Sequence, residues 1–164
     1  DEVQLLEVAS TPPVTPPPTK VSWSFESNIG GWAGFHGSNR ASTFGSKSRK
    51  SLEVYNRKQE GSGATASLLG NIQPGQRYRF STDVDIGRSK TVSANACAYL
   101  YLVDSKGRAQ QIALGQKKTA GGTWSKLQKD VQIPAGSFRR IDLRIVGSQK
   151  GQSLFIDNVS LNKL

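Results

Sequence analysis

The sequence has few of the side chains that carry redox and transition-metal chemistry. Its 164 residues include one cysteine, Cys97, one histidine, His36, and no methionine. A single cysteine cannot form a disulfide within the chain, and zinc sites built from several cysteine and histidine ligands are excluded. Neither redox nor zinc chemistry is therefore expected.

Long hydrophobic runs are also absent. None approaches the ~20 residues that a membrane helix needs, and no signal peptide or lipidation motif is recognisable. The length suffices for one domain with a buried core. We expect a soluble, secreted bacterial segment of a larger protein, monomeric, tethered to a catalytic domain and without membrane contact.

Acidic residues are scarce relative to basic ones. Lys and Arg number 22 against 12 Asp and Glu, a formal net charge of +10. Residues 1–19 hold three acids and no basic residue, so the remainder carries +13. A body this basic attracts polyanions at long range and loses that attraction in salt. Nucleic acid, acidic polysaccharide and an anionic surface are all admissible partners.

The composition changes abruptly near the start of the chain. Residues 10–19 form a Pro/Thr-rich stretch that favours extended polyproline-type chain and is typical of spacers between modules. We therefore interpret residues 1–19 as an interdomain linker or the end of a preceding domain, and residues 20–164 as the folded module.

From residue 21 onward the pattern predicts strands and turns only. Nine alternating or apolar runs are separated by glycine- and proline-containing turns, with no helical period, which indicates a sandwich of antiparallel sheets. The runs are 21–26, 51–57, 64–69, 77–86, 94–103, 110–114, 124–133, 139–146 and 153–161.

The last of these runs contains an acid among apolar residues. Leu154, Ile156 and Val159 share one face if a small bulge occurs near Asn158. Asp157 is costly to bury without a partner, and Glu26 closes the first run in a similar way. We predict that the first and last strands lie side by side and bring these two carboxylates together.

Alternation along three central runs predicts which side chains face outward. Tyr99 and Tyr101 point out of one run, and Asp142 and Arg144 point out of another. In run 77–86 the outward set includes Arg79, Asp83 and Asp85. If the three strands are neighbours, tyrosines, arginines and aspartates share one sheet face.

The order of several short motifs resembles that of non-catalytic carbohydrate-binding modules of the jelly-roll group, which includes families four, nine, sixteen and twenty-two. The resemblance extends over residues 21–161. The motifs that carry it are Ser24-Phe25-Glu26, Gly31-Trp32, Lys50-Ser51-Leu52-Glu53-Val54, Ile72-Gln73-Pro74-Gly75, Gly122-Thr123-Trp124, Ile133-Pro134-Ala135-Gly136 and Phe155-Ile156-Asp157-Asn158-Val159-Ser160-Leu161.

This resemblance implies an all-β jelly-roll sandwich with a structural calcium ion between the terminal strands. The side chains of Glu26 and Asp157 would hold the ion, and backbone carbonyls near Ser24 and Lys50 would complete its shell. Calcium prefers such a shell of six to eight oxygen ligands.

The resemblance also implies a sugar-binding groove on one sheet. A groove that binds sugars needs flat aromatic side chains on which the rings stack, and planar polar groups that form hydrogen bonds with the hydroxyls. Gln111 and Gln116 are further polar candidates for this groove, although alternation along their short strand does not decide which way they face. The candidate residues are Tyr99 and Tyr101 for stacking, Arg79, Asp83, Asp142 and Arg144 for polar contacts, and Trp32 with Phe35 as a loop wall; for Trp32 a place in the core is an equal alternative.

The arginines favour an acidic ligand, because a guanidinium binds carboxylate or sulfate in a bidentate manner. We expect alginate or polygalacturonate first and sulfated algal galactan next. A neutral β-glucan, xylan or chitin is the alternative, and a nucleic-acid or anionic-surface binder is a third. A further basic cluster, from Arg40 to Lys58, is interpreted as a solvated face, its part in binding left open.

Intrinsic catalysis is not expected. Asp83, Asp85 and Asp142 alternate with arginines on an open face, where they would stay ionised and could not donate a proton as glycosidase acids do. We expect the catalytic domain, a polysaccharide lyase or glycoside hydrolase, elsewhere in the full-length protein.

Overall fold

The computed structural model describes residues 15, 16, 18–147 and 149–164, and this part of the chain forms eleven strands and no helix. Accordingly, no helix long and apolar enough to cross a membrane occurs among the described residues. The predicted linker, residues 1–19, lies outside the described residues except for positions 15, 16, 18 and 19.

The strands follow one another with short connections. They are β1 (Lys20–Trp23), β2 (Trp32–Phe35), β3 (Ser38–Ser42), β4 (Ser51–Tyr55), β5 (Gly63–Ser67), β6 (Arg77–Asp85), β7 (Ser93–Asp104), β8 (Ala109–Ala120), β9 (Ser125–Gln132), β10 (Phe138–Gly147) and β11 (Leu154–Lys163).

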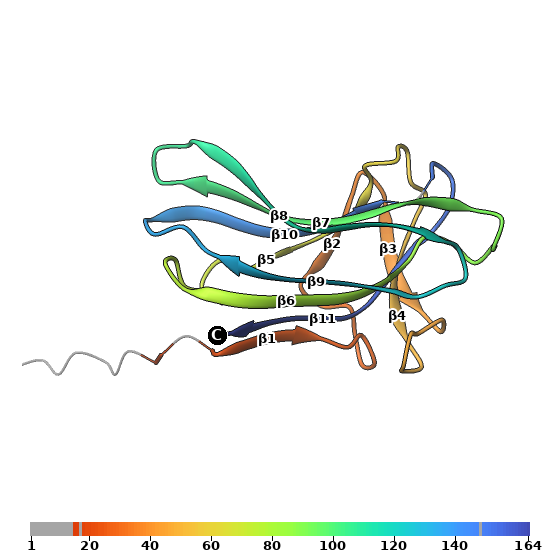
Figure 1. Ribbon diagram of the computed structural model, residues 1–164, viewed down its shortest axis with the longest axis horizontal. Coiled ribbons are helices and arrows are strands. Elements are labelled where there is room, and N and C mark those ends of the chain that lie inside the picture. The colour runs from red at the N-terminus through yellow and green to blue at the C-terminus, as the bar shows by residue number, and fades with distance from the viewer. Residues whose placement is uncertain (1–14, 17, 148) are drawn as a thin grey trace, which may run out of the picture.

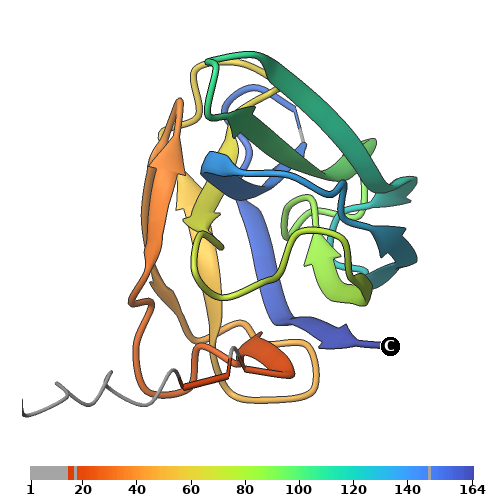
Figure 2. The same cartoon turned by 90° about the vertical axis from the view of Figure 1, so that its left-hand side faces the viewer.

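Two antiparallel sheets pack face to face (Figures 1 and 2). Sheet A has the order β3-β4-β11-β6-β9, with β1 paired to β11 as a sixth strand. Sheet B has the order β2-β5-β10-β7-β8. The predicted all-β, two-sheet antiparallel sandwich is confirmed.

The core lies between the sheets and is built by strict alternation along the long strands. Tyr78, Phe80 and Val84 of β6 face Leu100 and Leu102 of β7 across the core, and all five are fully buried. Burial of apolar area at about 25 cal/mol per Å² is the main favourable contribution to such a fold. The opposite sides of the same strands are therefore free to carry polar groups.

The terminal strands β1 and β11 lie side by side, as predicted (Figure 1). The pairing of β11 with β6 shifts in register between Asp157 and Ser160, and Asn158 has a φ of 48°. The predicted bulge at Asn158 is therefore present. It lets Ile156 and Val159 both face the core while Asp157 faces outward.

One expectation about neighbouring strands is wrong. β7 and β10 pair in sheet B, but β6 lies in sheet A between β11 and β9. The outward faces of these strands consequently lie on opposite sides of the sandwich. The sequence pattern fixes which residues point out of a strand, but it does not say which sheet the strand joins.

Candidate functional site

The outer face of sheet B gathers five of the eight predicted ligand-binding residues. Tyr99 lies directly opposite Arg144, and Tyr101 opposite Asp142, in the pairing of β7 with β10. Phe35 reaches the same face from the edge strand β2, because its ring lies beneath the Arg144 guanidinium. The face therefore combines aromatic and charged groups as predicted.

Four of these side chains and Arg140 form an interlocked layer, here called the aromatic–arginine stack. The Arg144 guanidinium lies 4.5 Å from the Phe35 ring centre and 4.2 Å from that of Tyr101. Asp142 accepts a 2.6 Å hydrogen bond from Arg140 Nε and lies 3.7 Å from Arg144 Nη2.

This stack changes the role that Arg144 can have. Its exposed fraction is 8%, the Phe35 and Tyr101 rings both lie against its guanidinium, and the Asp142 carboxylate is nearby. A guanidinium needs a free edge to grip a carboxylate in a bidentate manner. Arg144 thus forms part of the rigid floor of the site.

Beside the stack runs a groove made of two adjoining hollows, about 580 and 470 Å³ in volume. Cys97 and Gln116 line both hollows, so the two are continuous along β7 and β8. Tyr99 is half-buried in the larger hollow. The polar lining of the groove consists of Glu60, Ser93, Asn95, Gln111, Gln116, Lys118, Lys129 and Gln149.

The groove is suited chemically to a sugar chain. A half-buried tyrosine ring offers a stacking surface, and exposed amides of Asn95, Gln111, Gln116 and Gln149 can both donate and accept hydrogen bonds. Burial raises the pKa of the Cys97 thiol, which therefore stays protonated at neutral pH. The groove thus combines uncharged hydrogen-bonding groups with three charged ones, Glu60, Lys118 and Lys129.

Some residues that line the groove were not predicted from the sequence. Asn95 could have been, because alternation along β7 places it on the same face as Cys97, Tyr99 and Tyr101. The bulge between Ala98 and Tyr99 in the pairing with β8 made the facing of Gln111 and Gln116 ambiguous from sequence. Glu60 and Gln149 come from connections between strands, and no local pattern places such residues at a groove.

Three predicted groove residues lie elsewhere. Trp32 is 7% exposed and packs into the core, with ring centres 5.3 Å from Trp23 and 5.8 Å from Phe25. Arg79 lies on sheet A, where it forms an ion pair with Asp130 at 2.7 Å.

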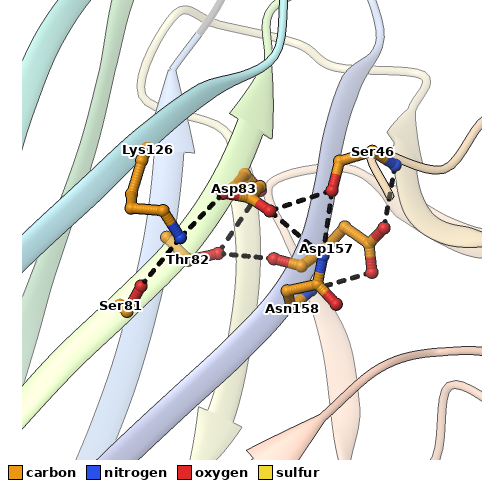
Figure 3. Close-up of polar contacts among 7 residues, drawn as sticks. All are labelled: Ser46, Ser81, Thr82, Asp83, Lys126, Asp157 and Asn158. Carbon is orange, nitrogen blue, oxygen red and sulfur yellow. Dashed lines mark hydrogen bonds and ion pairs between the residues drawn. The ribbon is translucent and has the colours of Figure 1, made fainter. Parts of the chain in front are cut away.

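Asp83 also lies on the outer face of sheet A, directly opposite Asp157 (Figure 3). It accepts hydrogen bonds from the Ser46 hydroxyl and the Asn158 amide and pairs with Lys126 at 3.3 Å. Burial alone would raise the pKa of Asp83, but these donors outweigh it and lower the pKa. The carboxylate is thus fully engaged in fixing the connection between β3 and β4.

That connection, residues 43–50, is here called the serine loop, and it brings the two predicted metal-binding carboxylates together. Asp157 accepts hydrogen bonds from the Ser46 N–H and the Ser48 hydroxyl, both at 2.9 Å. Glu26 accepts the Lys50 N–H at 2.8 Å. That bond, with lesser help from Ser48 and the Arg49 N–H, lowers the pKa of Glu26.

The oxygens around Ser48 fit a hard cation in part. The Ser48 hydroxyl contacts Asp157 at 2.9 Å, the Lys50 carbonyl at 3.1 Å and the Glu26 carboxylate. One hydroxyl proton can serve only one of these three acceptors at a time, so the other two accept no hydrogen bond from it. Calcium stabilises such a set, and each carboxylate keeps free lone pairs beside its N–H contacts.

The same donors also stabilise the carboxylates without an ion. No group of three or more His, Cys, Asp or Glu side chains that could hold a metal occurs in the described part of the chain. Ser24, predicted to add a carbonyl, is exposed beside Trp23 and Asn158 in a separate shallow hollow.

The basic cluster predicted between Arg40 and Lys58 divides into unlike parts. Arg40 pairs with the buried Glu53 at 2.7 Å and covers the Tyr55 ring. Arg57 is buried among backbone carbonyls. Only Lys47, Arg49, Lys50 and Lys58 match a solvated face.

These features define a two-layer β-sandwich that presents an aromatic, amide-lined groove on one sheet. The family model described as "Carbohydrate binding domain" matches residues 21–151. The chain belongs to this family of carbohydrate-binding modules.

Solved structures of similar fold include xylan-binding modules of family 22. One such xylan-binding domain superposes with a TM-score of 0.78 at 22% identity, covering 87% of this chain and 93% of its own. The first family 22 module of Paenibacillus barcinonensis Xyn10C gives 0.78 at 18% identity, with coverages of 87% and 92%. A structure of the first family 22 module and the catalytic module of Clostridium thermocellum xylanase 10B, complexed with xylohexaose, gives a TM-score of 0.78 at 19% identity. The match covers 88% of this chain and 28% of that one.

A closer relative in sequence is the peptidyl-Asp metalloendopeptidase of Pseudomonas aeruginosa. It is 44% identical over 163 residues, which is 98% of this chain and 27% of that protein. The chain thus spans about a quarter of the length of this relative.

Proposed function

We propose that this chain is a non-catalytic module that binds polysaccharide in the groove of sheet B. The observation that carries the proposal is the half-buried Tyr99 ring in a continuous groove lined by exposed amides. Stacking on a tyrosine and hydrogen bonds to amides suit the two kinds of surface that a sugar ring offers.

A neutral β-linked chain such as xylan is the favoured ligand. Asp142 offsets one of the two charges of Arg144 and Arg140, and Arg144 is 8% exposed with the Phe35 and Tyr101 rings against its guanidinium. Half of the polar residues that line the groove carry neutral amides. The xylan-binding names of the family 22 modules of like fold agree with this choice.

Calorimetric titration with xylohexaose, cello- and chito-oligosaccharides, alginate and polygalacturonate tests the proposal. We expect a neutral oligosaccharide to bind, and Tyr99→Ala to weaken it at least about tenfold, which is ~1.4 kcal/mol. Tyr55→Ala is the matched control, because Tyr55 lies under Arg40 on the other sheet. Binding that Tyr99→Ala leaves unchanged would contradict the assigned groove.

An acidic polysaccharide is the second candidate ligand. It is favoured by the exposed surface, where twenty of the 22 Lys and Arg side chains are exposed, while five of the nine described acids are buried. Such binding would weaken as salt screens the charges, whereas stacking and neutral hydrogen bonds would persist. Titrations at two ionic strengths therefore separate the two ligand classes.

We also propose that the module is part of a secreted bacterial enzyme. The 44% identity to the Pseudomonas aeruginosa metalloendopeptidase supports a peptidase as the catalytic part, in place of the lyase or hydrolase expected from sequence. The full-length protein would then digest casein in a metal-dependent manner, and the isolated module would not. Cleavage of xylan and not of casein by the full-length protein would favour a hydrolase instead.

A structural calcium ion is proposed beside Ser48, held by Glu26, Asp157 and the Lys50 carbonyl. An ion that binds only the folded state at about 100 times its Kd raises the free energy of unfolding by about 2.7 kcal/mol. We expect a higher melting temperature in calcium than in EDTA, and a smaller difference in Glu26→Gln, which lacks one of the two carboxylate ligands. Equal melting temperatures would show that the N–H donors alone stabilise these carboxylates.

A further inference from the structure

Arg57 lies two residues after β4 and is 3% exposed, yet no ion pair in the described part of the chain involves it. Its guanidinium instead donates six hydrogen bonds to five backbone carbonyls. The acceptors are Gln59 (3.4 Å), Glu60 (2.9 Å), Ser62 (3.3 and 2.9 Å), Gln149 (2.7 Å) and Gln152 (3.2 Å).

Burial lowers the pKa of Arg57 to about 10, and the nearby Glu60 charge opposes this shift. The side chain is therefore still cationic at neutral pH. Carbonyl dipoles offset the cost of burying that charge, and the cation adds a further hydrogen bond to the carbonyls of Gln59, Ser62 and Gln149, which also accept backbone N–H groups. Only the planar fork of arginine supplies donors in so many fixed directions.

The five carbonyls belong to two connections that are far apart in sequence. Gln59, Glu60 and Ser62 lie between β4 and β5, while Gln149 and Gln152 lie between β10 and β11. Two further backbone bonds stiffen these turns, from the Ser62 N–H to Gln59 and from the Gln152 N–H to Gln149. Arg57 thus joins both connections at one point.

Both connections form the wall of the smaller hollow of the groove. Glu60 and Gly61 line it from one connection and Gln149 from the other. The Gln149 side chain also donates to the Ser93 carbonyl at 3.2 Å, which ties the wall to the start of β7. The Gly147 N–H donates to the Ser62 carbonyl, which Arg57 also holds.

We propose that Arg57 is a positioning residue for ligand binding: from beneath the surface it sets the wall of the groove at the Glu60 and Gln149 end. This inference rests on the proposed function of the groove. Arg57 itself lines neither hollow of the groove. It acts on a polysaccharide only through the two connections that it holds.

Arg57→Lys tests this directly, because lysine keeps the charge but has three donors and no planar fork. We expect Arg57→Lys to weaken xylohexaose binding about tenfold or more, and Arg79→Lys, a matched change in the exposed pair on sheet A, to leave it unchanged. A folded Arg57→Lys variant that binds xylohexaose like the unaltered chain overturns the inference.

The Cys97 thiol provides a readout that needs no ligand. It lines the floor of both hollows and is the only cysteine of the chain. We expect N-ethylmaleimide to modify Cys97 several-fold faster in Arg57→Lys than in Arg79→Lys, because the wall above it is loosened. Equal modification rates in the two folded variants would count against the inference, whether or not xylohexaose binds. Absence of xylohexaose binding to the unaltered chain would by itself overturn only the proposed neutral ligand.

If Arg57→Lys fails to fold, hydrogen exchange of the unaltered chain tests whether the two connections respond to ligand binding. Xylohexaose is then expected to slow exchange of the Ser62 and Gln152 amide protons, which bond within the two connections. Unchanged exchange at both amides, with xylohexaose bound, overturns the inference.

Discussion

Asp83 and Asp85 lie two residues apart on β6, and their carboxylates have opposite surroundings. Asp83 accepts bonds from Ser46 and Asn158 and pairs with Lys126. Asp85 is fully buried, and its Oδ2 atom has no hydrogen-bond partner among the described residues. Burial raises the pKa of Asp85, although N–H groups including those of Gly87 and Gly122 oppose the shift.

Asp85→Asn should stabilise the fold at neutral pH, because the amide needs no charge to be desolvated and its oxygen can still accept the glycine N–H groups. Because its pKa is raised in the folded state, Asp85 contributes most to stability below its unfolded pKa of 3.8. This contribution is lost as the pH rises through the folded pKa. We expect a gain of about 1 kcal/mol at pH 7 that vanishes in acid. Thermal unfolding from pH 2 to 8 measures it.

Asp83→Asn should have the opposite effect. The lowered folded pKa means that its stabilisation is present above 3.8 and is lost as pH falls through the folded value. Removing this charge-assisted acceptor is expected to cost about 2 kcal/mol at pH 7. The same pH series serves both variants. A change in stability of the same sign in Asp83→Asn and Asp85→Asn at pH 7 would contradict the opposite pKa directions of the two carboxylates.

At the scale of strands, the sequence predicted those rich in β-branched and aromatic residues and missed two others. β2 reads Trp-Ala-Gly-Phe and β3 reads Ser-Asn-Arg-Ala-Ser, so neither has the composition of a strand. Their pairing with β5 and β4 supplies the stability that local propensity lacks. Such tertiary support is invisible in a local pattern.

The bulge of β11 was predictable because one extra residue restores the apolar parity on both sides of Asn158. Asn158 adopts a left-handed conformation, φ 48°, and its amide donates to the Ser46 hydroxyl and to Asp83 (Figure 3). It therefore joins the bulge to the serine loop by two bonds. Asparagine accepts this conformation more readily than most residues do.

Substitutions at Asn158 separate these two contributions. Asn158→Gly keeps the backbone conformation but loses both side-chain bonds, at a cost of about 1 kcal/mol. Asn158→Ala loses the bonds and adds backbone strain, so we expect about 2–3 kcal/mol. Denaturant titration gives the free energies of unfolding, and an alanine variant as stable as the glycine variant would show that the strain is absent.

At the scale of the molecule, the fold separates the charges that the sequence only counts. Glu53, Asp83, Asp85, Asp142 and Asp157 are buried, whereas among the basic residues only Arg57 and Arg144 are. The net charge was readable from composition, but the burial of acids and the division of Arg79 and Arg144 between two sheets were not. Strand order, which decides both, depends on long-range pairing that no local pattern encodes.

This distribution predicts how salt acts on binding. Exposed charges interact over a Debye length of about 30 Å at 0.01 M salt but about 3 Å at 1 M. We expect polygalacturonate to be retained by the immobilised chain at low salt and released at 1 M, in Tyr99→Ala as in the unaltered chain, because dispersed cations hold it. Xylohexaose binding is expected to survive 1 M salt and to need Tyr99.

Polygalacturonate binding that survives 1 M salt and is lost in Tyr99→Ala would contradict this division. It would mean that the acidic chain occupies the groove. Lys118 and Lys129, the cations that line the groove, would then be the groups that bind its carboxylates. Lys118→Gln with Lys129→Gln should in that event weaken polygalacturonate and spare xylohexaose, because a neutral chain gains nothing from either charge.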